Sequence, residues 1–181
     1  GPRPARAGSE TDAEYGGMCA QARRAPRALP LAPVLPESYP AAIRADAVAL
    51  WEEGRLLHCA VPSGSGRRPV HFLVYWGFHG ARRPSHPSYA PNEKNLALLI
   101  KIAAQIGDQP IAICGDFNVE PHESAVLEAV LRTEGAAGEG QLWFDAAATW
   151  AARSRTLPED TCRPPTAAHS RIDVAFRNHR L

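Results

Sequence analysis

The stretch that decides the fold is Ile111-Ala-Ile-Cys-Gly-Asp-Phe-Asn-Val119. It is a short apolar run that breaks into Gly-Asp-Phe-Asn, so we expect a buried strand that ends in polar side chains. Because side chains alternate between the two faces of an extended chain, Asp116 and Asn118 are predicted to point one way and Phe117 into the core. An acid can bind a divalent cation or accept a proton from water, and a neighbouring amide can orient that water or a phosphate oxygen. The alternative is an Asp-Phe-Asn turn that caps the next helix.

The patterns around this stretch predict an α/β domain. Further strands are predicted at residues 16–22, 55–61, 69–76 and 170–176. The second and third flank a Gly/Ser turn and are expected to form an antiparallel hairpin. Helices are predicted at 92–106, where an apolar stripe ends at Gly107, and from Pro121 to about residue 131. Residues 41–53 suit either a helix or a strand, and the five prolines within 26–40 predict a connecting loop.

Length and composition fit one globular domain. The chain has 181 residues, 45% of them hydrophobic, and a formal net charge of +1, so no global field favours nucleic acid or an anionic membrane. It contains no apolar run long enough to span a bilayer and no signal-peptide pattern. The four cysteines lack metal-finger spacing and are interpreted as buried thiols, which favours an intracellular, reducing compartment. We expect residues 1–14 to be a disordered tail and residues 15–181 to be the domain.

Two other groups of residues suggest chemistry. Asp173 lies inside an apolar strand, where a lone carboxylate is costly unless it is paired, for example with a histidine whose tautomer it fixes. The alternatives are a salt bridge to Arg171 or an exposed edge position. The loop after residue 76 holds His79 and Arg82, which could contact a phosphodiester. A plain surface histidine is the alternative for His79.

In this order, these elements resemble the endonuclease/exonuclease/phosphatase superfamily, which includes the DNase I-like nucleases. The matching segments are Gly-Asp-Phe-Asn at 115–118, Ser-Arg-Ile-Asp at 170–173, the glycine-opened strand at 16–20 and the strand end at 74–77. The resemblance implies a four-layer β-sandwich flanked by helices. It also implies hydrolysis of a phosphoester with the help of Mg²⁺ or Mn²⁺, most simply by an endonuclease-type phosphodiesterase that acts on nucleic acid.

The same resemblance assigns roles to individual residues. Asp116 would hold and activate the attacking water or help to bind the metal ion, and Asn118 would orient water and a phosphate oxygen. Asp173 would support a general-base histidine. Tyr75 or Trp76 would face the scissile phosphate, with a one-residue ambiguity in the alignment.

The sequence also departs from the family pattern. It lacks the upstream Gln-Glu motif, whose glutamate is the principal metal ligand, and the final Ser-Asp-His motif, so we expect a domain truncated at both ends. Three hypotheses remain open from the sequence: a phosphoesterase or nuclease fragment, a catalytically dead remnant that keeps the fold and binds a partner, and an unrelated α/β binding module. Lipid and inositol phosphates remain alternative substrates, and the sequence gives no indication of oligomeric state.

Overall fold

The computed structural model describes residues 29–30, 39–62, 68–131, 143–146, 151, 153–154 and 173–178. The strands are β1 (Leu29–Pro30), β2 (Leu56–Val61), β3 (Val70–Trp76), β4 (Ile111–Asp116), β5 (Trp143–Asp145) and β6 (Asp173–Asn178). The helices are α1 (Ala41–Glu52), α2 (Tyr89–Ile106), the 3₁₀ turn η1 (Pro121–Glu123) and α3 (Ala125–Leu131). The strand predicted at 16–22, the tail at 1–14 and most of the turn at 62–66 lie outside the described residues.

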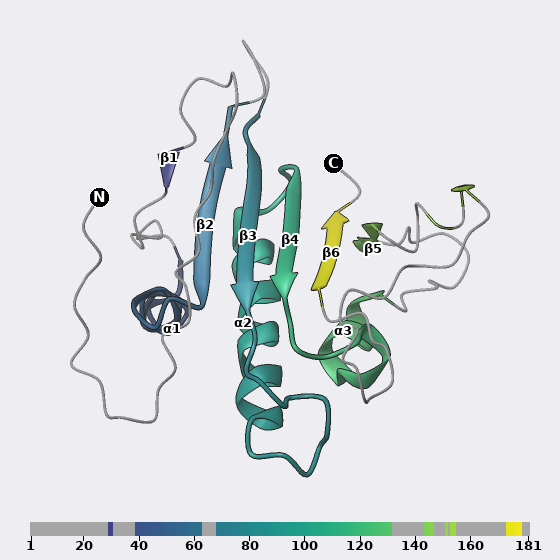
Figure 1. The fold of residues 1–181 in the computed structure, drawn as a ribbon. Coiled ribbons are helices and arrows are strands. Elements are labelled where there is room, and N and C mark those ends of the chain that lie inside the picture. The colour runs from purple at the N-terminus through teal and green to yellow at the C-terminus, as the bar shows by residue number, and fades with distance from the viewer. Residues whose placement is uncertain are drawn as a thin grey trace, which may run out of the picture.

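The strands form one mixed sheet in the order β1-β2-β3-β4-β6-β5 (Figure 1). The predicted hairpin of β2 and β3 is confirmed, with Leu56 opposite Tyr75. β3 and β4 pair in parallel, whereas β6 is antiparallel to both β4 and β5. The proline-rich segment contributes β1, a two-residue strand at the sheet edge, where Pro30 does not interrupt an internal ladder. The predicted α/β class is confirmed.

The helices refine the sequence prediction. Residues 41–52 are helical, which settles the choice between helix and strand. Helix α2 begins at Tyr89, earlier than predicted, and is followed by Gly107, whose φ of 74° suits glycine. The helix predicted from Pro121 is broken in two, because Ser124 between η1 and α3 has an extended backbone with φ of −104° and ψ of 120°. The hydroxyl of Ser124 then accepts a hydrogen bond from the Leu127 amide in α3.

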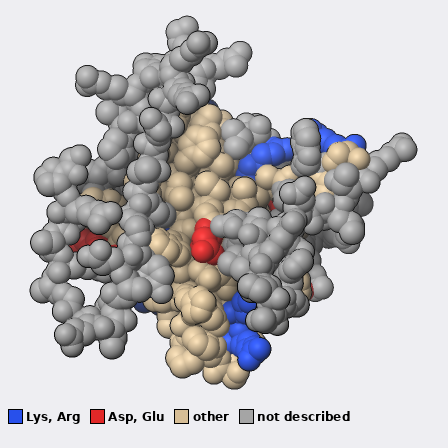
Figure 2. Space-filling model, viewed as in Figure 1, with Lys and Arg blue, Asp and Glu red and all other residues tan. Residues whose placement is uncertain are grey.

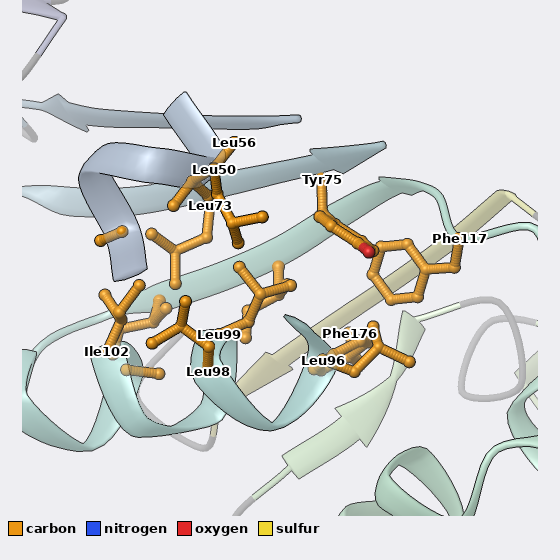
Figure 3. Packing of buried hydrophobic residues seen from close by; sticks show 14 of the residues in the cluster. Leu50, Leu56, Leu73, Tyr75, Leu96, Leu98, Leu99, Ile102, Phe117 and Phe176 are labelled. Atoms are coloured by element: carbon orange, nitrogen blue, oxygen red, sulfur yellow. The ribbon is translucent and has the colours of Figure 1, made fainter. Parts of the chain in front are cut away.

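The core lies between the sheet and α2. In Figure 1, α2 runs behind β3 and β4, and Figure 3 shows leucines of α2 reaching the sheet side chains. Leu73 and Ile113 of the sheet are fully buried, as is Leu99 of the predicted helical stripe. Cys59 is a buried free thiol, and Cys114 is a half-buried one. No helix in the described part of the chain is long and apolar enough to cross a membrane.

Candidate functional site

Three neighbouring strands bring the candidate residues to one end of the sheet. Trp76, the last residue of β3, is in register with Asp116, the last residue of β4. Asp116 is in turn directly opposite Asp173, the first residue of β6. Figure 1 shows β3 and β4 ending where β6 begins. The structure therefore brings together the two motifs, although more than 50 residues separate them in the sequence.

The backbone turns immediately after Asp116. Strand β4 ends there, and Asn118 has a φ of 52°, which is unusual for a residue other than glycine. The Asn118 amide donates to Asp116 Oδ1 at 3.0 Å. The prediction of an extended chain up to Asn118 is wrong, because an Asp-Phe-Asn turn brings Asp116 and Asn118 together. The burial predicted for Phe117 is confirmed, since its ring packs edge-on against Phe176.

Gly77 joins this turn to the end of β3. Its amide donates to the carbonyl of Asp116 at 2.7 Å, and its carbonyl accepts from Asn118 Nδ2 at 3.4 Å. A Cβ on Gly77 would lie 2.2 Å from the carbonyl oxygen of Phe117. The two strand ends can approach this closely only because residue 77 has no side chain.

Arg55, immediately before β2, supports the same strand end and was not among the residues predicted from the sequence. Its Nη1 donates to the carbonyls of Trp76 at 3.3 Å and Gly77 at 3.2 Å. The guanidinium carbon lies 3.8 Å from the centre of the Phe78 ring, which places a cation over an aromatic face. No local sequence pattern indicates these hydrogen bonds, because they join residues 21 and 22 positions apart.

The prediction of Tyr75 as a phosphate contact is corrected. Its side chain is fully buried on the α2 side of the sheet, and its hydroxyl donates to Asn92 at 2.8 Å. Burial raises the pKa of Tyr75 to about 12, so it remains a neutral phenol at physiological pH. Trp76 is half-buried on the other face and in register with Asp116, so of the two aromatic residues only Trp76 lies on the face turned away from α2.

The two loop residues proposed as phosphate contacts differ in their surroundings. His79 is exposed. Arg82 is held by two carboxylates: its Nε lies 3.0 Å from Glu123 Oε2, and its Nη2 lies 3.0 Å from Glu120 Oε1. Burial raises the pKa of the Glu123 carboxyl, but the hydrogen bonds from Arg82 outweigh this and the net shift is downward. Arg82 therefore holds the loop against η1, and its guanidinium is bound by carboxylates where the sequence predicted a phosphate contact.

The residues at this sheet end include two of the donor types that a metal ion would need. Carboxylate and amide oxygens, as in Asp116 and Asn118, are the donors that Mg²⁺ prefers. Within the described residues, however, no group of three or more His, Cys, Asp or Glu side chains could hold a metal ion. The donor set among the described residues is thus incomplete for a metal ion.

Comparison with known proteins gives structural likeness only. No family model and no curated protein matches the sequence. Among solved structures, the chain is similar to the human Nocturnin catalytic domain with bound sulfate (17% identity, TM-score 0.43) and to truncated Caenorhabditis elegans TDP2 (16%, 0.43). It is also similar to D. rerio TDP2 complexed with a single-strand DNA product (15%, 0.45).

Each of these comparisons covers 68% of this chain. The matched region covers 41% of the Nocturnin chain and 46% of each of these two TDP2 chains, so this chain matches less than half of their length.

Proposed function

We propose that this chain is part of a metal-dependent phosphoester hydrolase of the endonuclease/exonuclease/phosphatase type, with a nucleic acid phosphodiester as its substrate. One observation carries the proposal: Trp76, Asp116 and Asp173 stand in register on three adjacent strands, with Asn118 turned back onto Asp116. Two acidic residues and an amide at one strand end suit phosphoryl chemistry, in which water must be oriented and negative charge balanced.

The roles follow from this placement. Asp116 would hold the attacking water or supply one ligand to a divalent cation, a group whose chemistry, when bound, is positive charge beside the phosphoryl oxygens. The turn fixes Asn118 next to Asp116 through the Asn118 backbone N–H. The side-chain carboxamide of Asn118 would orient a phosphate oxygen. Asp173 would orient a histidine that acts as a base. His79, exposed on the loop after β3, would contact the substrate phosphate.

The position of Trp76 favours a nucleic acid over a small sugar phosphate as the substrate. It is half-buried and lies next to Asp116 in register, at the edge of the proposed site. The face of the sheet turned away from α2, seen in Figure 2, shows mainly uncharged surface with acidic surface near its middle. An indole beside the reacting phosphate gives a base a surface on which to stack, and base–aromatic stacking contributes about 1–3 kcal/mol per base.

The test is hydrolysis of supercoiled plasmid, a single-stranded DNA oligonucleotide and bis(p-nitrophenyl) phosphate with Mg²⁺ or Mn²⁺. Asp116→Asn should lower the rate by about 10²-fold or more, the usual cost of removing a catalytic acid–base group. Asp46→Asn is the matched control, because Asp46 is exposed on α1. Equal rates in wild type and Asp116→Asn would refute the role of Asp116.

A non-catalytic remnant is the second candidate, favoured by the incomplete donor set among the described residues. It predicts no hydrolysis of any of these substrates by the wild type, and binding of the DNA oligonucleotide that Asp116→Asn leaves unchanged. Hydrolysis of an inositol phosphate or a phospholipid head group, with DNA untouched, would keep the phosphoesterase assignment and refute nucleic acid as the substrate.

A further inference from the structure

Asn92 is a buried polar residue with partners on both sides of the proposed site. It lies in the first turn of α2 and is 1% exposed. Its Oδ1 accepts hydrogen bonds from the Tyr75 hydroxyl at 2.8 Å and from the Phe78 amide at 3.0 Å. Its Nδ2 donates to the carbonyl of Phe117 at 3.1 Å.

The orientation of this amide group is fixed by chemistry. A backbone N–H can only donate and a backbone carbonyl can only accept, so the oxygen of Asn92 must face Phe78 and its nitrogen must face Phe117. An aliphatic side chain offers neither group, and a hydroxyl carries donor and acceptor on a single atom, whereas the carboxamide carries them on two separate atoms. The position therefore requires a carboxamide rather than mere bulk.

The two loop contacts lie on segments that carry candidate catalytic residues. Phe78 follows Trp76 and Gly77 at the end of β3, whereas Phe117 lies between Asp116 and Asn118 after β4. Asn92 thus links the two segments through its side chain on α2, and the hydrogen bond from the Gly77 amide to the Asp116 carbonyl links them directly.

We propose that Asn92 is a positioning residue that sets the separation of Trp76 from Asp116 and Asn118. The inference rests on the proposed function for its catalytic consequence, although its structural part stands alone. Because Asn92 is buried under the strand ends, it acts through the backbones of Phe78 and Phe117 and does not touch substrate. A shift of about 1 Å at a site of this kind typically costs about 10²-fold in rate.

Tyr75→Phe provides a matched control. It removes one of the three hydrogen bonds of Asn92 from the same buried cluster and leaves both loop contacts in place. If Asn92 served only to stabilise the core, Asn92→Ala and Tyr75→Phe would lower stability without a selective effect at the strand ends. If Asn92 positions the loops, only Asn92→Ala should loosen them.

The first measurement is backbone amide hydrogen exchange on the full chain, which needs no activity. In Asn92→Ala, protection of the Phe78 and Asn118 amides should fall by about tenfold or more, while amides around Ile113 in the middle of β4 keep their protection after correction for global stability. In Tyr75→Phe, all of these amides should retain their relative protection. Unchanged relative protection of Phe78 and Asn118 in Asn92→Ala would overturn the proposal.

Asn92→Asp keeps the inference testable if the alanine variant does not fold. Aspartate retains an acceptor for Phe78 but, when ionised, loses the donor to Phe117. It should therefore loosen Asn118 by about tenfold and leave Phe78 protected. Loss of protection at both amides to the same extent, or at neither, would contradict the assigned geometry.

The second measurement is steady-state kinetics on whichever substrate the wild type hydrolyses. Asn92→Ala should lower kcat by about 10–10²-fold with KM changed less than about threefold, whereas Tyr75→Phe should leave kcat within about threefold. Equal losses of kcat in both variants would refute positioning. If the wild type hydrolyses nothing, the proposed function fails, and the exchange data still decide the role of Asn92.

Discussion

Gly77→Ala tests how closely the two strand ends must approach. The new Cβ would lie 2.2 Å from the carbonyl oxygen of Phe117, whereas real Cβ atoms essentially never come closer than 3.0 Å. The segments must therefore separate by roughly 0.8 Å, the difference between these two distances. The same movement would stretch the bond between the Gly77 amide and the Asp116 carbonyl from 2.7 Å to roughly 3.5 Å, outside the normal range for N–H···O bonds.

The two effects set the expected magnitude. Overpacking a buried contact costs about 1–3 kcal/mol, and the net loss of one hydrogen bond costs about 0.5–1.5 kcal/mol. We expect Gly77→Ala to lower the free energy of unfolding by about 2–4 kcal/mol. Urea denaturation followed by circular dichroism measures this loss as a lower midpoint with an unchanged m value.

Gly107→Ala is the control for the cost of replacing a glycine. Gly107 has a φ of 74°, and a Cβ at this position would meet no atom within 4 Å, so alanine there encounters backbone strain and no clash. We expect it to cost about 1–3 kcal/mol, the usual cost of holding a residue in a sparsely populated backbone region. If Gly77→Ala costs no more than Gly107→Ala, the close approach of the strand ends does not constrain the fold, and the proposed geometry of the site is refuted.

Two further predictions concern titration and ion pairing. Burial, and then the charge of His71, lowers the pKa of His58 to about 4. The unfolded chain therefore binds more protons than the folded chain between about pH 4 and 6.5. The free energy of unfolding should fall as the pH drops through this window, by up to about 1.4 kcal/mol per pH unit. His58→Gln should flatten this dependence in urea titrations at about pH 5 and pH 7, and an equally steep dependence in the variant would contradict the assignment. Arg82→Gln should lower stability by about 1 kcal/mol in wild type but by much less in a Glu123→Gln background; a double-mutant cycle measures the coupling, and a coupling near zero would show that the ion pair does not fasten the loop.

Much of the fold follows from local patterns in the sequence. The β2–β3 hairpin and α2 were predicted because their apolar residues repeat with the periods of strand and helix. Leu96 and Leu99, both in the predicted stripe of α2, are buried against the sheet. The register of β4 with β6 places the two acidic motifs opposite one another at one sheet end.

The finer geometry of the site was not predictable in the same way. The prediction that Asp116 and Asn118 lie close together relied on the alternation of side chains along an extended strand. The left-handed backbone at Asn118 interrupts this alternation, and a turn brings the two residues together instead. Tyr75 and Trp76 are adjacent and both aromatic, and only the position of α2 decides which of them is buried. Asn92 and Arg55 act through backbone groups 14 to 25 residues away, and such contacts leave no periodic trace in the sequence.

The pairing of Asp116 with Asp173 leads to a prediction about the trade-off between stability and activity. The next pairs along the ladder are Gly115 with Val174 and Cys114 with Ala175, and the one basic residue of this ladder, Arg177, lies opposite Ala112 at its other end. Like charges directly opposite one another on a sheet are destabilising by about 0.2–1 kcal/mol. Stability alone would favour an uncharged or basic residue at one of these two positions, whereas the chemistry that we propose uses both acids.

Asp116→Asn should therefore be at least as stable as wild type in EDTA, and up to about 1 kcal/mol more stable, while losing hydrolytic activity. Asparagine keeps a carbonyl oxygen that can accept from the Asn118 amide, so the turn itself should survive the substitution. Thermal unfolding in EDTA, compared with Asp46→Asn on α1, measures the difference. A clear loss of stability in Asp116→Asn would mean that the carboxylate of Asp116 is a structural group, and the charge-balance reasoning for the site would then be wrong.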